Sequence, residues 1–582
     1  MAWTYLMIRE QDFHHKLFGE NEGIFLGYYY LIMGKVFYPV IFILMLLESS
    51  IAWGQSYYWI GFTDKNDTEY SLAFPEDYLS MRAIERRERQ NIEIDSLDLP
   101  VNQKYITKVL NLGAELLNTS KWLNGITVKT EAATFANNAM QLDYVREVQL
   151  TKSSTTTKSA INKFIDPLTP GQLLEIDTAE YGASVFQVSQ LNGQFLHNQG
   201  YRGQGMHIAI LDAGFYKADQ YPAFDSLWYD GRVLGIRDFV SPGSDVYDGH
   251  YHGMSVLSIM AGNKPGQLIG TAPRASYWLL RTEDITSEFL IEEDNWVAGA
   301  EFADSVGADI INSSLGYFIF DDSTMNHSYA DMDGHTTRVS RAANIAASRG
   351  ILVFASAGNE GNKDDEWKYI IAPSDADSVI GVGAANKEGV AAPFTSYGPA
   401  SDGDVKPNVS AVGWNTFVQR SNGTIGTGNG TSYSSPVIAG IVACLWQSNP
   451  QATVSQVKSA VERSAHLYNS PDSLLGYGIP DMRLADQILK TTVLEQFENK
   501  GDWLAYPNPA NEYIILQKHS KASSGDIRIS FYSADGKILR QEIRPDASKI
   551  ILRNISILES GLLFLQIISE DTNETIKIKK IP

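Results

Sequence analysis

The segment NGTSYSSPVIAGIVACLW, residues 429–446, predicts a buried helix with a serine at its start. Its run of small and apolar side chains is typical of a helix that is packed on all sides, and Pro436 is tolerated only in a first turn. Ser432 is therefore expected at or just before the helix N-terminus. Backbone N–H groups point outward there and favour developing negative charge, which suits a nucleophile. A plain N-cap serine would give the same pattern.

The sequence around this helix alternates between strand-like and helix-like stretches. Short apolar runs predict buried strands, and Ala-rich stretches such as RVSRAANIAASRG, residues 338–350, predict helices. This alternation is typical of βαβ units around a buried parallel sheet. We therefore expect a large α/β domain over residues 181–490. Its expected strands include MHIAILD (206–212), ADIINSSLG (308–316), ILVFASAG (351–358) and SVIGVGAA (378–385).

A smaller unit precedes this domain, over residues 55–150. The strand-like pieces YYWIGF and GITVKT accompany a helix-like piece that follows Pro75, which predicts an α+β domain. The charged run Arg86, Arg87 and Arg89 alternates with glutamate. We interpret it as a solvated helix face rather than a processing signal.

Two linkers and a β domain account for most of the remaining chain. Residues 151–180 are polar and rich in turn formers, which predicts an exposed tether that proteases can cut. Residues 491–503 form a second expected linker. Residues 504–582 alternate apolar and polar side chains in several short runs, with a hairpin signal at Asp535–Gly536. They predict a small all-β sandwich.

The N-terminal part of the chain, residues 1–54, predicts an export leader. The apolar run Val36–Leu47 is too short for a bilayer, which needs about 20 residues, so a membrane anchor is the less favoured interpretation. Ala52 and Gly54 fit the small-x-small pattern of a signal peptidase site. The leader pattern begins at Met33, which is expected to be the true start after an over-extended reading frame. The mature chain is expected to have no transmembrane anchor.

Composition narrows the classes of function. The 582 residues contain 47 Lys and Arg against 68 Asp and Glu, a net charge of -21. Such a field repels polyphosphates, so nucleic acid is not expected as a partner. The single cysteine, Cys444, excludes an intrachain disulfide and cysteine-rich metal sites.

Three residues of the α/β domain stand where reacting groups collect. Asp212 ends an expected strand, at the carboxyl edge of the sheet where ligands bind. Asn359 follows another strand beside Ala and Gly, so its amide can donate into a cavity. His252 precedes a glycine, a sign of close approach. Taken singly, these residues also fit an N-cap, a turn and a structural histidine.

Together with Ser432, these segments resemble the subtilisin-like serine proteases, in which the residues follow the order Asp, His, Asn, Ser. The motifs are ILDAG, HGMSV, AGNEG and NGTSYSSPVIAG. The resemblance implies a three-layer α/β domain with a mostly parallel sheet. It also implies a catalytic triad of Asp212, His252 and Ser432, with Asn359 as the oxyanion donor.

A fifth segment extends the resemblance. Ser314, Leu315 and Gly316 match the family's SLG segment, which binds the substrate backbone as an added strand. Two positions depart from the family pattern. Met254 stands where threonine is usual, which affects local packing. Tyr317 stands where glycine is frequent and is expected to narrow the pocket entrance.

The resemblance implies a secreted serine endopeptidase that hydrolyses protein and peptide substrates through an acyl-enzyme intermediate. Catalysis of this kind needs no cofactor. Acidic side chains are numerous enough for a structural Ca²⁺, but no EF-hand loop is legible and no metal ligand is assigned. No heptad pattern is evident, so a monomer is expected.

The flanking domains also take roles from resemblance. Residues 55–150 stand where the family has a propeptide that assists folding and blocks the cleft, with maturation expected within residues 151–180. The C-terminal module begins with YPNPA and ends in a lysine-rich strand. It resembles the sorting domain of the type IX secretion system of Bacteroidetes, which implies contact with secretion machinery, export through the periplasm and a secreted or surface location. A carbohydrate- or substrate-binding β-sandwich is the alternative.

Two other classes of function stay open from the sequence. A catalytically inactive subtilisin-like adhesion or scaffold protein would keep the fold without turnover. Asp248, His250 and His252 alternate along an expected strand, so they would present three ligand-type groups on one face and suggest a metal-dependent hydrolase. Sensitivity to a chelator would separate the metal hydrolase from a serine enzyme.

Overall fold

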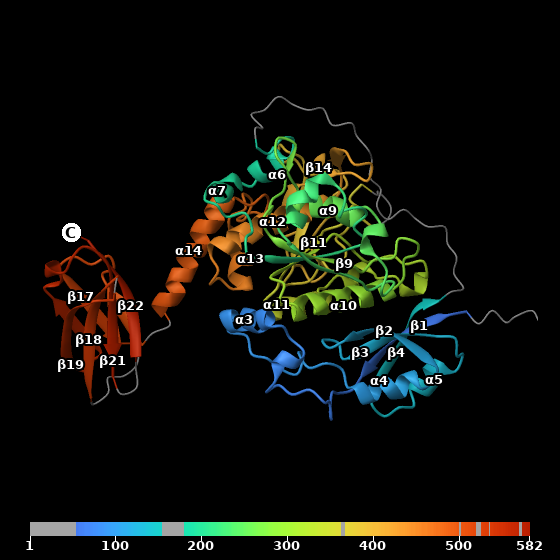
Figure 1. Cartoon of the computed structure of the whole chain (residues 1–582), viewed down its shortest axis with the longest axis horizontal. Helices are drawn as coiled ribbons and strands as arrows, with labels where there is room; N and C mark the ends of the chain where they lie inside the picture. The colour runs from blue at the N-terminus through green and yellow to red at the C-terminus, as the bar shows by residue number, and fades with distance from the viewer. Residues whose placement is uncertain are drawn as a thin grey trace, which may run out of the picture.

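The computed structural model describes residues 54–153, 180–362, 367–499, 502–518, 525–534, 536–569 and 573–581. We call residues 54–153 the N-terminal domain, 180–499 the central domain and 502–581 the C-terminal domain (Figure 1). The expected leader and most of the expected maturation linker lie outside the described residues.

The central domain is built on a seven-stranded sheet whose neighbouring strands all pair in parallel. The spatial order is β13-β12-β11-β10-β5-β9-β6. The predicted α/β fold with a parallel sheet is thereby confirmed. The strands are β5 (His207–Asp212), β6 (Val233–Asp238), β9 (Ser276–Arg281), β10 (Ile310–Ser313), β11 (Leu352–Ser356), β12 (Ile380–Ala385) and β13 (Val409–Val412).

Helices cover both faces of this sheet, which gives three layers (Figure 1). On strand β5, Ile208 and Ile210 pack with residues of α9 and α12, whereas Ala209 and Leu211 pack with residues of α10 and α11. The alternation follows from the two-residue period of a strand. The covering helices are α9 (His252–Ala261), α10 (Ile291–Ser305), α11 (Arg338–Ser348) and α12 (Thr431–Ser448).

Shorter elements complete the central domain. The helices are α6 (Val185–Ser189), α7 (Gln194–Asn198), α8 (Asp225–Tyr229), α13 (Val454–Arg463) and α14 (Met482–Asn499). The hairpins are β7 (Asn263–Lys264) with β8 (Leu268–Ile269), and β14 (Thr416–Gln419) with β15 (Ile425–Gly428).

The N-terminal domain has the predicted α+β character. Its antiparallel sheet has the order β2-β3-β1-β4 and lies against α10 (Figure 1). Direct bonds join them: for example, Asn118 Nδ2 donates to Asn295 Oδ1 at 2.7 Å, and Thr127 Oγ1 donates to Asp294 Oδ2 at 3.0 Å. The elements are β1 (Ser56–Phe62), α3 (Met81–Gln90), α4 (Gln103–Leu110), β2 (Ala114–Ser120), β3 (Gly125–Thr130), α5 (Phe135–Ala139) and β4 (Val145–Ser153).

The interpretation of the arginine run as a solvated helix face is wrong for Arg86 and Arg87, whereas Arg89 is exposed. Arg86 and Arg87, on helix α3, are 0% and 1% exposed. Both guanidinium groups bond Asp304, at the end of α10 in the central domain. A local charge pattern carries no information about partners about 220 residues away, so the helix looked like a surface element.

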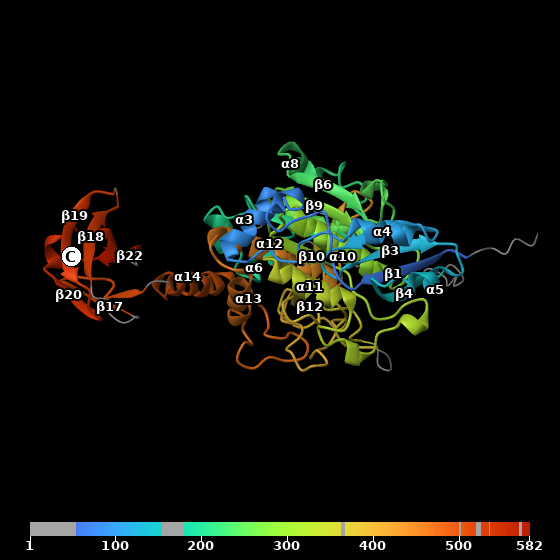
Figure 2. The same cartoon turned by 90° about the horizontal axis from the view of Figure 1, so that it is seen from below.

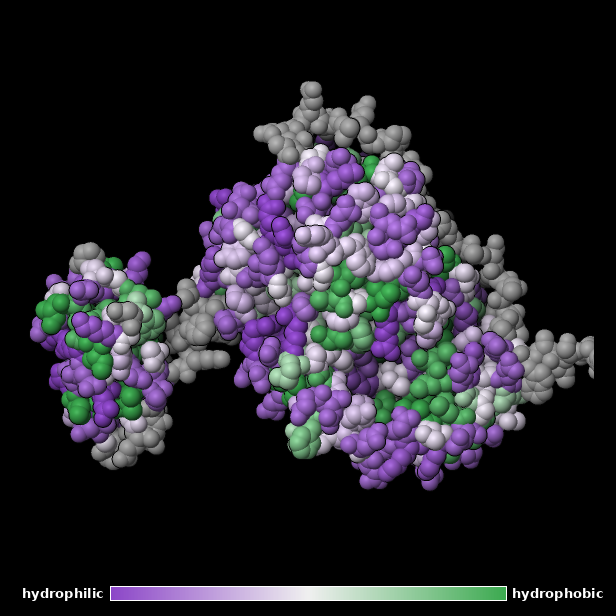
Figure 3. All heavy atoms as spheres, in the orientation of Figure 1, coloured by the Kyte–Doolittle hydropathy of each residue, from purple (hydrophilic) through white to green (hydrophobic). Residues whose placement is uncertain are grey.

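The C-terminal domain consists of two antiparallel sheets, β16-β17-β20 and β19-β18-β21-β22. Leu516 of the first sheet and Phe531 of the second belong to one apolar core, as expected for a sandwich. The domain lies at the end of α14, apart from the other two domains (Figures 2 and 3). Its strands are β16 (Trp503–Tyr506), β17 (Tyr513–Lys518), β18 (Asp526–Ser533), β19 (Ile538–Pro545), β20 (Lys549–Arg553), β21 (Gly561–Ile568) and β22 (Asn573–Lys580).

Membrane-spanning helices were sought throughout the described residues. None of the helices there combines the length and the apolar character that crossing a bilayer requires.

Candidate active site

Asp212 and His252 meet at the carboxyl edge of the sheet. Asp212 is the last residue of β5, and His252 is the first residue of α9. His252 Nδ1 lies 2.8 Å from Asp212 Oδ1 and 3.1 Å from Oδ2. Both side chains are buried, so solvent does not compete for this contact. The structure thus brings together the first two predicted site residues.

Glycine makes this close approach feasible. A β-carbon added at Gly253 would lie 2.8 Å from Asp212 Cβ and 2.5 Å from the carbonyl oxygen of Gly214. Both separations are shorter than van der Waals contact, so a larger residue after His252 would push the helix away from the strand. The glycine that follows the histidine therefore has a steric reason in the site.

Ser432 lies in the first turn of α12, two residues after the N-cap Gly430. Its Oγ donates to the carbonyl oxygen of Ser314 at 3.2 Å. The ring of the next residue, Tyr433, stacks on the imidazole of His252 with centroids 5.8 Å apart. The start of α12 and the start of α9 are therefore neighbours, so the predicted nucleophile and the predicted base belong to adjoining helix starts.

Asn359 lies beside the same helix start. Its Oδ1 accepts bonds from Thr431 N at 2.8 Å and from Thr431 Oγ1 at 3.1 Å. Because both Thr431 groups donate, the amide is oriented with its oxygen toward Thr431, and Nδ2 keeps its donors for another partner. The predicted oxyanion donor is thus held in a defined orientation.

Two donors border the space next to Gly430. A methyl group at Gly430, whose φ is +152°, would lie 3.6 Å from Asn359 Nδ2 and 3.6 Å from the backbone nitrogen of Ser432. Glycine leaves this space free. Two N–H groups beside a serine hydroxyl are the arrangement that stabilises a developing oxyanion.

Ser314 supports the serine-bearing helix. Pro436 lies inside α12, one turn after Ser432, so the prediction of a first-turn proline was wrong by a few residues. Proline has no N–H, which leaves the Ser432 carbonyl without its usual helical donor. Ser314 Oγ donates to that carbonyl at 2.8 Å. This contact was not predicted from the sequence. The signal for it was a proline four residues after a serine, because such a proline removes the helical donor of the serine carbonyl.

The two departures from the family pattern lie in the protein interior. Met254 is fully buried in the core between the sheet and α9. Tyr317 is also fully buried, and its hydroxyl donates to Glu283 Oε2 at 3.1 Å. A side chain in the interior does not narrow a pocket entrance, so that expectation for Tyr317 is wrong.

The three-ligand metal site is not formed. Asp248 ends a short 3₁₀ helix and His252 begins α9, so the segment is no strand and the expected common face does not exist. His250 Nδ1 accepts from the His252 backbone N–H at 3.3 Å, and burial lowers the pKa of His250 to about 4. Over the ranges that the structure describes, the acidic side chains close enough together to hold a metal ion are Glu283, Glu288 and Glu292. Asp248, His250 and His252 are not among them.

The assembled groups fit acyl transfer. A buried carboxylate orients an imidazole, a serine occupies the first turn of the neighbouring helix, and two N–H donors border the adjoining space. All four residues predicted for catalysis come together at one edge of the sheet. They arrive from β5, α9, α12 and the loop after β11.

Comparison with protein families gives three matches along the chain. Residues 203–478 match the subtilase family, and residues 57–164 match the peptidase S8 propeptide domain of Bacteroidota. Residues 504–581 match a secretion system C-terminal sorting domain. The matches follow the order of the three domains.

Individual proteins similar to this chain include several subtilisins. Subtilisin NAT of Bacillus subtilis subsp. natto is 32% identical over 314 residues, which cover 53% of this chain and 73% of that protein. Subtilisin E of Bacillus subtilis strain 168 gives the same values. Subtilisin of Bacillus pumilus is 30% identical over 307 residues, 52% of this chain and 98% of that protein.

Replacement of Ser314 by alanine should destabilise the central domain. The change leaves the buried Ser432 carbonyl without a donor, which costs about 1–3 kcal/mol. We expect a corresponding loss in the free energy of unfolding, measured by urea denaturation in a Ser432→Ala background that prevents self-digestion. Ser356→Ala is the control, because the Ser356 hydroxyl is equally buried but bonds Leu315 O at 3.4 Å. Equal losses in the two variants would contradict the role given to Ser314.

Proposed function

The chain belongs to the subtilase family, and we propose on this basis that Ser432 is the nucleophile of a secreted serine endopeptidase. Its Oγ would attack a peptide carbonyl and form an acyl-enzyme, which water then hydrolyses. The observation that carries the proposal is the buried bond between His252 Nδ1 and Asp212. With Nδ1 directed at Asp212, Nε2 is the ring nitrogen that would take the serine proton.

His252 would act first as a base and then as an acid. It takes the proton of Ser432 Oγ during attack and gives it to the leaving amine. Asp212 holds the tautomer with the proton on Nδ1 and stabilises the imidazolium. The same three groups then activate water for deacylation.

The oxyanion would lie between Asn359 Nδ2 and the Ser432 backbone N–H. A donor of this kind contributes about 2.7–4 kcal/mol to transition-state stabilisation. Thr431 supports the proposal because it donates two hydrogen bonds to the amide oxygen of Asn359. The N–H groups of the amide can then bind the substrate.

The segment Ser314–Leu315–Gly316 would bind the substrate backbone. It follows the end of β10, where regular pairing with β5 and β11 stops at Ser313. Main-chain groups beyond that point can pair with an extended peptide. Substrates are therefore proteins and peptides in extended conformation, and no step requires a cofactor.

The flanking domains would control when and where the enzyme acts. We propose that residues 55–150 are a propeptide, that maturation cuts within residues 151–180 and that the active protein is a monomer. The match to a sorting domain indicates export by type IX secretion, so the protein is secreted or held at the cell surface. Residues 504–582 would contact the secretion machinery and leave the chemistry to the central domain.

Ser432→Ala should abolish peptide hydrolysis and leave the precursor uncut, because no hydroxyl remains to form the acyl-enzyme. The measurement is labelling of the folded protein with a fluorophosphonate probe, followed by digestion and mass spectrometry. We expect label on Ser432 in the parent and its loss in His252→Ala. Label on another residue, or turnover by Ser432→Ala, would overturn the assignment and favour another enzyme class.

Asn359→Asp should lower kcat by about 10²–10³ with little change in KM. The substitution keeps an oxygen for Thr431 and the volume of the side chain but removes the N–H donors. Steady-state kinetics on a peptide substrate test it. Asn422→Asp, at an exposed turn, is the control and should retain parental kcat. A parental kcat in Asn359→Asp would exclude the residue from the oxyanion site.

Deletion of residues 504–582 should trap the enzyme in the periplasm of a Bacteroidota host while its peptidase activity persists, because among the described residues the apolar core of the sandwich and that of the central domain have no member in common. Fractionation into periplasm and medium, with an activity assay on each, tests the prediction. Release of the truncated protein into the medium at the parental level would contradict a sorting role.

A further inference from the structure

The chain between β1 and α4, residues 63–102, leaves the N-terminal sheet and carries helix α3 to the central domain (Figure 1). We call these residues the arm. At the start of α3, the backbone N–H of Ser80 donates to the carbonyl oxygen of Ser305, the last residue of α10, at 2.9 Å. The arm therefore contacts a helix end, whereas the sheet covers the side of the same helix.

Arg86 donates to acceptors at and just beyond the C-terminal ends of two helices. Its guanidinium donates to the carboxylate of Asp304, to Ala308 O at 2.5 Å and to Arg349 O at 3.1 Å. Asp304 belongs to the last turn of α10, and Arg349 is the C-cap of α11. Helix C-termini lack donors for their last carbonyls and favour cations. A fully buried guanidinium meets both needs at once.

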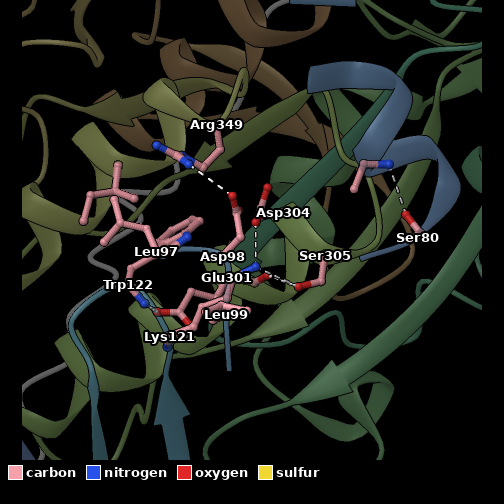
Figure 4. Close-up of polar contacts among 12 residues, drawn as sticks. Ser80, Leu97, Asp98, Leu99, Lys121, Trp122, Glu301, Asp304, Ser305 and Arg349 are labelled. Carbon is pink, nitrogen blue, oxygen red and sulfur yellow. Dashed lines mark hydrogen bonds and ion pairs between the residues drawn. The ribbon is translucent and has the colours of Figure 1, made fainter. Parts of the chain in front are cut away.

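Arg87 extends the contact into a buried cluster of charges. It bonds Asp304 Oδ1 at 2.9 Å and Oδ2 at 3.0 Å, and it bonds Asp98 of the arm at 2.5 Å. Asp98 in turn accepts from Arg349 at 3.2 Å, and Lys121 Nζ lies 2.7 Å from Asp304 Oδ2 (Figure 4). Cations and carboxylates from both domains therefore alternate through the cluster.

Asp304 is the centre of this cluster. Burial opposes ionisation, but Lys121, Arg87 and Arg86 together hold the pKa of Asp304 well below its usual value. The carboxylate is 0% exposed, and the three cations come from the N-terminal domain. Removal of that domain would leave an acidic helix end on the central domain, which makes a basic helix the fitting partner.

Uncharged hydrogen bonds also join the arm to these helix ends of the central domain. Gln90 Nε2 donates to Gly350 O at 2.8 Å, and its Oε1 accepts from Val454 N, the first residue of α13, at 3.0 Å. The arm thus touches the ends of three helices of the central domain. None of these contacts involves Asp212, His252 or Ser432.

We propose that the arm anchors the N-terminal domain to the peptidase through this helix-end surface. Cutting the linker within residues 151–180 removes none of the contacts made by Arg86, Arg87 and Gln90. These contacts therefore outlast the cut, and the arm sets how slowly the cut N-terminal fragment dissociates from the peptidase. The inference rests on the proposed role of residues 55–150 as a propeptide, and it assigns their retention to the arm rather than to the sheet alone.

The test measures physical retention and does not depend on activity. A recognition site for an unrelated protease is inserted between residues 154 and 179 of the full chain carrying Ser432→Ala. After cutting, size-exclusion chromatography over time gives the dissociation rate of the N-terminal fragment. Arg86→Gln with Arg87→Gln should raise that rate about 100-fold or more, because loss of a partner leaves Asp304 buried with too few cations.

Arg89→Gln is the matched control. Arg89 lies on the same helix, but its pair with Asp309 is about a third exposed on the arginine side, so it contributes little. Its variant should dissociate within about threefold of the parent. Equal rates for the double variant and Arg89→Gln would overturn the proposal. Because the nucleophile is absent from every sample, this result is independent of whether the protein is a protease.

The double variant is replaced if it does not fold, which circular dichroism of the uncut chain would reveal. Gln90→Ala then serves as the test variant. Gln90→Ala removes two uncharged bonds to the central domain and leaves the ion cluster intact. We expect its fragment to dissociate about tenfold faster than the parent fragment. An unchanged rate would then overturn the proposal.

Discussion

The structure depends on how the buried carboxylates of helix α10 are paired, since their partners come from both the N-terminal and the central domain. Glu293, Asp294, Glu301 and Asp304 are all buried, and a buried charge is tolerated only when it is paired or hydrogen-bonded. Arg338, of the central domain itself, pairs with Asp294 at 2.9 Å. Most of the other cover comes from the N-terminal domain: Ser120 Oγ donates to Glu301 Oε1 at 2.5 Å, and Lys121 and two arginines bond Asp304. The opposite face of α10 packs on the sheet, where Trp296 Nε1 donates to Ser313 Oγ at 2.8 Å. One helix thus links the N-terminal domain to the strands whose carboxyl ends carry the site.

The candidate site is held by small and polar residues rather than by the reacting groups themselves. Gly253 allows the approach of His252 to Asp212, Thr431 orients Asn359, and Ser314 supplies the hydrogen bond that a proline denies to Ser432. Each of these contacts fixes a group that we propose to be catalytic, and such preorganisation would lower the barrier without reorganisation during the reaction. The site therefore depends on packing at the sheet edge. The contacts of the arm lie elsewhere, at the C-terminal ends of α10 and α11 and at the start of α13.

Much of this arrangement can be predicted from local sequence because its determinants are local. The apolar runs that became β5, β10, β11 and β12 have a period and length that specify buried parallel strands, and the carboxyl ends of such strands converge. That is why Asp212 and Asn359 could be assigned. The errors have equally physical causes. The partners of Arg86 and Arg87 lie in another domain, the segment 248–252 turns into a helix instead of continuing as a strand, and burial of Tyr317 depends on a bond to Glu283 that no spacing reveals.

The order of residues along the chain determines when the arm can dock during synthesis. Arg86 and its partner Asp304 are separated by 218 positions, and its farther acceptor Arg349 by 263, so a long loop must close before the cluster can form. Synthesis and export run from the N-terminus, and Ser432 follows Arg349 along the chain. Once residue 350 has emerged, every charged member of the cluster is present while the helix that bears the serine is still to come. The charged cluster can therefore assemble while the central domain is still incomplete, so docking of the arm does not have to wait for the helix that bears Ser432.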